Sequence, residues 1–138
     1  MGNRAVITTA PYDQNSVGIY VHWNGGQESV EGFAKACKEL GYRDPTQDCY
    51  GVARLIESIA LFFGSDGRSV GVDVCHRLDE DNGDNGVWLI GPDWTVSHRD
   101  RKFPVETPAD WVTRDAIAAD IIRITQAAEA ARAARETV

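Results

Sequence analysis

The chain lacks most of the patterns that mark a specialised class of protein. Its 138 residues include three cysteines, Cys37, Cys49 and Cys75, an odd number without CxxC spacing, which disfavours a disulfide framework and indicates a reducing compartment. The longest apolar stretch, LIESIALFF, is too short and amphipathic to span a bilayer, and MGNRAVITTA lacks the apolar core of a secretory signal. These absences predict a cytoplasmic protein without membrane association.

Basic residues are also scarce. There are 14 Lys and Arg against 21 Asp and Glu, for a net charge of −7, and the only basic run, Arg99 and Arg101-Lys102, is interrupted by Asp100. Counterion release from a phosphate backbone requires clustered cations, so we expect no direct binding of nucleic acid. The acidity would suit a basic protein partner or mimicry of nucleic acid, although it also serves ordinary solubility.

The residues that are present suit one compact unit. Hydrophobic residues make up 43% of the chain and charged residues 25%, as in soluble globular proteins, and a second independent core would need a longer chain. We divide the sequence into a core domain over residues 1–106 and a C-terminal helix over residues 107–138. That helix is expected to pack on the core or to mediate oligomerisation.

Two segments near the N-terminus are rich in β-branched and aromatic residues. Residues 4–9 and 17–23 flank the loop sequence PYDQNS, and we predict a strand pair. Gly25-Gly26 then predicts a structural turn in which glycine permits positive φ. Alternation along the second strand places Val17, Ile19, Val21 and Trp23 on a core face and Gly18, Tyr20, His22 and Asn24 on the opposite face.

Helical spacing of apolar residues predicts three helices. The first follows the double glycine and stops at Gly41, and the second runs from Cys49 to Phe63 with Asp48 as its N-cap. Thr107-Pro108-Ala109-Asp110 resembles a capping box that starts a long final helix. The second half of that helix is rich in alanine and buries little area, so we expect it to project unless another chain covers it. This favours a homo-oligomer.

Three short strand candidates follow the second helix: SVGVDVC (69–75), GVWLI (86–90) and WTVSHR (94–99). They read as an antiparallel meander, with DNGDNG as a solvated hairpin turn whose Asn-Gly steps supply positive φ. The element order lacks regular strand–helix alternation, so the predicted class is α+β. We expect an antiparallel sheet of about five strands packed by two helices, with a long Ala-rich C-terminal helix.

No pattern in the chain indicates a catalytic or metal site. An EF-hand loop starting at Asp79 fails because Gly83 and Ile90 occupy its fifth and twelfth positions, and no zinc spacing is present. There is no GxSxG elbow, Cys-His signature or phosphate-binding glycine motif. We therefore favour a binding protein over an enzyme, with no metal and no cofactor.

One row of polar residues could contact a ligand. Tyr20, His22 and Asn24 follow one another on one face of a strand, where they could stack on and hydrogen-bond a heterocycle, or form the contact surface of a dimer. A satisfied polar strand face is the simpler alternative.

The combination of NRAVITT, IYVHWNGG with a helix after it, and LDEDNGDNG resembles a group of small, functionally uncharacterised accessory proteins of bacterial phages and prophages. The resemblance covers residues 3–99 and leaves out the C-terminal helix. It brings no catalytic residues with it. It implies a phage protein in the cytoplasm of a bacterial host, and small accessory proteins of that kind often counter host defence.

Within that implication two mechanisms fit a small acidic binder. One is a sponge that sequesters a nucleotide immune signal, and it requires some arginines to converge on a pocket. The other is an inhibitor of a host defence complex, of the anti-CRISPR kind, whose acidic surface occupies a nucleic-acid channel. A structural oligomer without an anti-defence role is a third reading. The predicted ligand-binding residues are Tyr20, His22, Trp23, Asn24, Arg54, Arg99 and Arg101, and the predicted partner-binding residues are Asp79, Glu80, Asp81 and Asp84.

Overall fold

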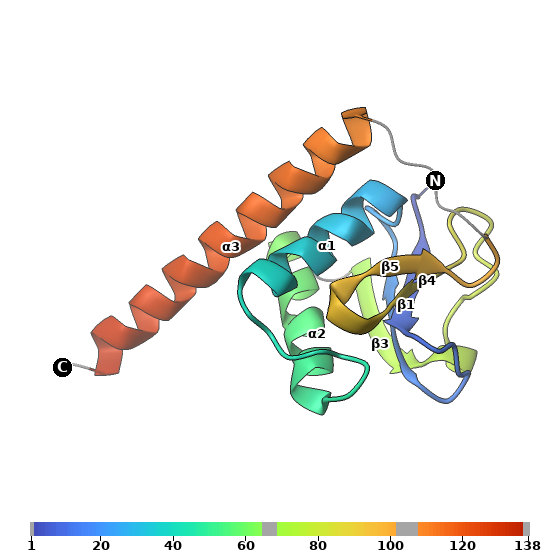
Figure 1. The fold of residues 1–138 in the computed structure, drawn as a ribbon, viewed down its shortest axis with the longest axis horizontal. Helices are drawn as coiled ribbons and strands as arrows, with labels where there is room; N and C mark the ends of the chain where they lie inside the picture. Colours follow the sequence, from blue (N-terminus) through green and yellow to red (C-terminus); the bar gives the residue numbers. More distant parts are fainter. Residues whose placement is uncertain (1, 65–68, 102–107, 137–138) are drawn as a thin grey trace.

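The computed structural model describes residues 2–64, 69–101 and 108–136, with only the backbone given for 108–110. It contains one five-stranded sheet, two helices packed on it and a long C-terminal helix, which confirms the α+β class (Figure 1). The elements are β1 (Ala5–Thr9), β2 (Val17–Val21), α1 (Gln27–Glu39), α2 (Cys49–Phe63), β3 (Val70–Val74), η2 (Cys75–Arg77), β4 (Val87–Ile90), η3 (Pro92–Trp94), β5 (Val96–His98) and α3 (Pro108–Glu136).

The sheet is mixed, with strand order β3-β2-β1-β4-β5. The predicted strand pair β1–β2 is confirmed, antiparallel with Ala5 opposite Val21. The predicted antiparallel sheet of about five strands is confirmed in the main, with the exception that β1 and β4 run parallel. The predicted meander is wrong: β3 pairs with β2 at one edge, and only β4 and β5 form an antiparallel pair at the other.

The chain between β3 and β4 explains this topology. It leaves the β3 edge and covers the sheet face opposite the helices, where Val6, Cys75 and Val87 form a small second core. β1 is thus covered on both faces, and Ala5 to Thr8 are all buried. A strand that is buried on both faces does not alternate between apolar and polar residues, and the β1 sequence AVIT is an example.

The loop 79–86 within this connection is not the predicted hairpin turn, because the strands on either side of it do not pair with each other. It is organised by the side chain of Asn82, which is only 2% exposed. The Asn82 Oδ1 accepts from the backbone N–H of Asp84, Asn85 and Gly86, at 3.1 to 3.2 Å. Its Nδ2 donates to the carbonyls of Asp79 and Gly86. Gly83 and Gly86 do adopt the predicted positive φ, at 78° and 66°.

The helices form two further layers on the other face of the sheet. α1 and α2 lie against the sheet, and α3 crosses their outer side (Figure 1). At the crossing, a Cβ on Gly32 would lie 2.9 Å from the Cβ of Ile117, so only glycine permits this approach of α1 and α3. Ile117, Ala118 and Ile121 join the main core, whereas every residue from 126 to 136 is exposed.

The predicted helix signals are largely confirmed. The Asp48 Oδ1 caps α2 by accepting from the N–H of Tyr50 at 2.7 Å, and Gly41 follows α1 with a φ of 76°. Thr107 of the predicted capping box lies outside the described residues.

The stretch from Trp23 to Gly26 corrects two predictions. The strand ends at Val21, so alternation no longer governs Trp23, which is 46% exposed and not in the core. The positive φ falls on Asn24, at 58°, rather than on a glycine. Gly25 is needed for a different reason, since a Cβ there would lie 2.5 Å from the Asn3 carbonyl oxygen.

Candidate ligand-binding site

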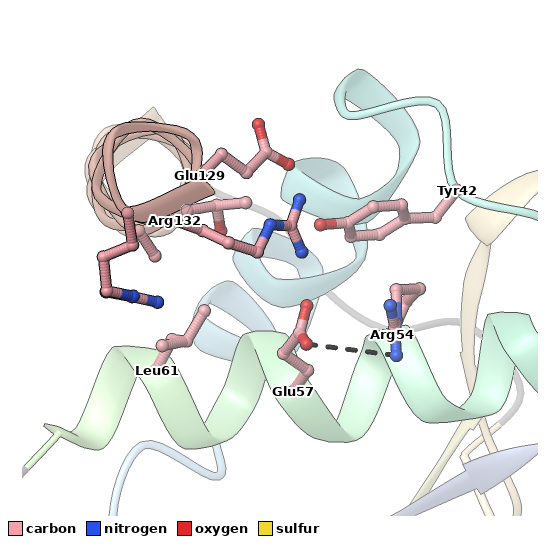
Figure 2. A pocket seen from close by; sticks show the side chains of 9 residues that line it. Tyr42, Arg54, Glu57, Leu61, Glu129 and Arg132 are labelled. Carbon is pink, nitrogen blue, oxygen red and sulfur yellow. Dashed lines mark ion pairs between the residues drawn. The ribbon is translucent and has the colours of Figure 1, made fainter. Parts of the chain in front are cut away.

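A cavity of about 340 Å³ lies between α2, α3 and the loop that joins α1 to α2, and we call it the α2–α3 pocket (Figure 2). Its volume is at the low end of the range for small-molecule sites. Figure 2 shows the Tyr42 side chain reaching from the loop into the space between the two helices. The lining residues are Tyr42, Arg54, Glu57, Leu61, Thr125, Ala128, Glu129, Arg132 and Arg135.

Helical spacing brings these side chains to one place. On α2, Arg54, Glu57 and Leu61 follow one another at steps of three and four and share a face. On α3, the stripe that buries Ile121 continues through Thr125 and then Ala128, Arg132 and Arg135. The pocket forms where this stripe leaves the apolar core and passes α2.

Tyr42 is positioned by the turn that ends α1. Its N–H donates to the carbonyl of Cys37 at 3.1 Å, and its own carbonyl accepts from the indole N–H of Trp94 at 3.2 Å. Burial raises the pKa of the Tyr42 phenol, and the nearby Glu57 raises it further. The ring therefore presents a neutral hydroxyl and an aromatic edge to the pocket.

The arginines of the pocket are held only weakly by other protein groups. Arg54 Nη2 lies 3.9 Å from Glu57 Oε2, and Arg132 Nε lies 4.0 Å from Glu136 Oε1, both at the limit of an ion pair. For Arg135, no ion pair is found within the described part of the chain. The pocket is thus lined by three guanidinium groups and two carboxylates, with a third carboxylate, that of Glu136, beside Arg132 at its border.

Two buried polar atoms on residues that line this pocket have no hydrogen-bond partner among the described residues. They are the Thr125 Oγ1, on a residue only 4% exposed, and the Arg54 Nε. More than nine in ten buried polar groups in native proteins are hydrogen-bonded, so each exception calls for an explanation. Because protein covers both atoms, a ligand in the cavity would satisfy them only after these side chains turn toward it.

The lining suits recognition more than covalent chemistry. Guanidinium groups bind phosphate or carboxylate through charge-assisted and often bidentate hydrogen bonds. Glu57 and Glu129 can accept from hydroxyl or amino groups, and the Tyr42 ring can pack on an aromatic one. None of the nine lining residues is a histidine or cysteine.

The predicted pair Tyr20 and His22 does not line this pocket. It lies in a separate groove between the end of β2 and the start of β3. Tyr20 Oη and His22 Nδ1 are 3.0 Å apart, within hydrogen-bond distance, and the groove is completed by residues 69–71. The Trp23 ring meets the His22 ring edge to face at 5.1 Å. Asn24 instead donates to the Ser29 Oγ at 3.3 Å, at the start of α1. Among the residues that the structure describes, no arginine lines this groove.

Arg99 and Arg101 lie in a third place, beside the loop 79–86. Arg99 pairs with Asp100 at 3.0 Å and with Glu80 at 3.7 Å, and its guanidinium lies over the Tyr12 ring. Arg101 lies over the Trp88 ring at 5.6 Å. The structure therefore places five of the predicted ligand residues in three separate grooves, and Trp23 and Asn24 line none of the three. Of the seven, Arg54 is the one that lines the α2–α3 pocket.

The four acidic residues of the predicted partner surface differ in their surroundings. Asp84 accepts from Arg4 Nε at 2.7 Å, and this contact lowers the pKa of the Asp84 carboxyl. Glu80 accepts from the Tyr12 hydroxyl and faces Arg99. Asp79 and Asp81 are exposed. The loop is thus a surface of mixed charge.

Sequence reasoning missed most of the pocket. The signal for it was present as arginine and glutamate at steps of three, in Arg54 and Glu57 on one helix and in Glu129, Arg132 and Arg135 on another. Such spacing is equally typical of a solvated helix face. Only the packing of α3 against α2 makes these residues neighbours.

Comparisons with protein-family models, with curated proteins and with solved structures find no match for this chain. Within the described residues, no group of three or more His, Cys, Asp or Glu is placed to hold a metal ion. The helices that the structure describes include none with the length and apolar character needed to cross a membrane. The candidate site therefore rests on its own geometry.

Proposed function

We propose that this chain is a non-enzymatic binding protein that sequesters a small anionic, nucleotide-like ligand in the α2–α3 pocket. The resemblance of residues 3–99 to phage accessory proteins supports a role in the cytoplasm of a bacterial host, as a countermeasure against a defence signal. The observation that carries the proposal is the convergence of three arginines on a pocket whose lining residues include two with buried donors unpartnered among the described residues.

The chemistry of the lining favours a nucleotide over a simple anion. A phosphate would accept from Arg54, Arg132 and the Thr125 hydroxyl. Ribose hydroxyls or an amino group of a base would donate to Glu57 or Glu129. A nucleotide carries both phosphate acceptors for the arginines and donors for the glutamates, so it matches both kinds of lining residue.

Binding is tested by calorimetry and thermal shift with a panel of cyclic nucleotides, ADP-ribose derivatives and inorganic phosphate. We expect one nucleotide to raise the Tm, and we expect Arg132→Gln and Arg54→Gln each to weaken its binding at least tenfold. Arg123→Gln is the matched control, because Arg123 is exposed on the same helix and outside the pocket. Equal binding by Arg132→Gln, Arg54→Gln and the wild type would refute the assignment of the pocket.

The same panel separates the alternatives. Loss of binding in His22→Ala with no change in Arg132→Gln would move the site to the Tyr20–His22 groove. Absence of binding across the panel would overturn the sponge. Co-purification of a defence complex that depends on Asp79 and Asp81 would then identify the protein as an inhibitor, and absence of both would leave a structural oligomer.

A further inference from the structure

β3 forms the longer free edge of the sheet. It has five residues and, among the described strands, pairs only with β2, whereas β5 at the other edge has three residues. The bonds from His22 N to Ser69 O and from Cys75 N to Ser16 O fix which β3 residues bond to β2. By alternation, the backbone groups of Val70, Val72 and Val74 point away from the sheet.

This edge carries little of the protection that proteins usually give to exposed strands. The strand sequence VGVDV has no proline and no lysine. Its one charge is already engaged, because Asp73 Oδ2 pairs with Arg77 Nε at 3.2 Å and Asp73 Oδ1 accepts from the N–H of Val74 at 2.7 Å. The outward N–H of Val72 has no such local acceptor within the described residues.

The edge is also apolar on the side that faces the helices. Val72 is 49% exposed and Val17 is 43% exposed, both unusually high for strand valines. They border an apolar cavity of about 490 Å³ that Val52 and Ile56 of α2 close from the other side. α2 thus leaves this end of the sheet incompletely covered.

We infer that a second copy of this chain pairs along this edge, with the two β3 strands antiparallel about a twofold axis at Val72. In this register Val72 lies opposite its own copy, so its N–H and C=O bond reciprocally across the axis. Val70 lies opposite Val74 and donates its N–H to the Val74 carbonyl, while the Val74 N–H stays bonded to Asp73 Oδ1. Gly71 lies opposite Asp73, so no like charges face each other across the axis.

The strand favours a second copy over an unrelated peptide because it is complementary to itself. Its valines are placed symmetrically about Val72, and the isologous register needs no side chain to change face. The valine side chains of the second copy would lie on the helix side of the sheet and cover the apolar cavity. The two sheets would then be continuous.

The test is the oligomeric state by sedimentation velocity over a range of concentrations. We expect a reversible dimer in the wild type and loss of the dimer in Val72→Lys, because two ammonium groups would meet at the axis. Val112→Lys is the matched control, since Val112 is an exposed valine on α3, and it should leave the dimer intact. A monomer at every concentration, or a dimer broken by Val112→Lys and not by Val72→Lys, would overturn the inference.

A second measurement needs no variant. Hydrogen exchange of the Val72 amide should slow as the concentration of the wild type rises, because dimerisation gives this N–H an acceptor. Exchange at Val72 that is independent of concentration, in a sample that does dimerise, would place the interface elsewhere. Both outcomes are independent of ligand binding in the α2–α3 pocket.

Discussion

The buried hydroxyl of Thr125 leads to the most informative prediction, the effect of Thr125→Val. This residue lines the α2–α3 pocket and is 4% exposed, and its buried Oγ1 has no hydrogen-bond partner among the described residues. Valine has nearly the same shape and a similar helix propensity, so the substitution exchanges an unsatisfied hydroxyl for a methyl group. We expect it to stabilise the ligand-free protein and to weaken ligand binding.

The expected magnitudes follow from the burial of this group. An unsatisfied buried polar group costs about 1–3 kcal/mol, and its removal should raise the free energy of unfolding by about 1–2 kcal/mol. For a chain of this length that corresponds to a Tm increase of roughly 3–6 °C. Loss of one hydrogen bond to the ligand, worth about 1 kcal/mol, should weaken binding roughly fivefold.

Chemical denaturation and calorimetry measure the two effects separately. Thr113→Val is the matched control, because Thr113 is exposed on the same helix and its substitution should change stability by less than about 0.5 kcal/mol. If Thr125→Val were no more stable than Thr113→Val, a water molecule would already bond to the Thr125 hydroxyl. The hydroxyl would then give no support to ligand binding in this pocket.

Three further predictions concern the rest of the fold. Asn82→Ala should lower the free energy of unfolding by about 2–4 kcal/mol, because five hydrogen bonds of the loop 79–86 are lost and buried backbone groups are left unpaired; urea denaturation measures this. Burial lowers the pKa of His98 below 6.5, so the folded state binds fewer protons than the unfolded state, and the stability from this group, complete above pH 6.5, should be lost as pH falls below it. Denaturation at pH 7.5 and pH 5.5 should show this loss in the wild type and in His76→Gln, and a smaller loss in His98→Gln. Burial raises the pKa of Cys37 to about 12, so a thiol reagent should modify exposed Cys49 rapidly and leave Cys37 unmodified until the protein unfolds.

Each of these predictions has an outcome that contradicts it. Asn82→Ala with the stability of the exposed control Asn15→Ala would show that the loop does not depend on its central amide. An equal loss of stability at pH 5.5 in His98→Gln and the wild type would assign the pH dependence to other groups. Modification of Cys37 at the rate of Cys49 in the folded protein would contradict the packed core around α1.

Local sequence was sufficient to predict the elements that local physics controls. Helix α2 begins after Asp48 and ends before Gly64 because a capping carboxylate and a residue with positive φ act within a few positions of the helix end. The pairing of β1 with β2 follows from a short loop between two strands. The α+β class follows from the order of the elements.

Alternation failed where the strand ended or was covered twice. The alternation of β2, continued two residues past Val21, predicts a core position for Trp23, but the strand ends at Val21 and the chain turns there. In β1 the pattern is absent because the connection 75–86 covers the second face. Alternation of apolar and polar residues indicates which face of a strand is buried only within the strand itself, and only when the other face is exposed to solvent.

The sequence alone determined that this is an α+β chain with three helices, an acidic surface and no recognised catalytic motif. It did not determine which strands are neighbours, because a strand sequence specifies what its two faces bury and not which backbone lies beside it. Nor could it assemble the candidate site. Arg54 and Thr125 are 71 positions apart, and they line one pocket only because Gly32 lets α3 pack closely on α1 and so carries its polar second half past α2.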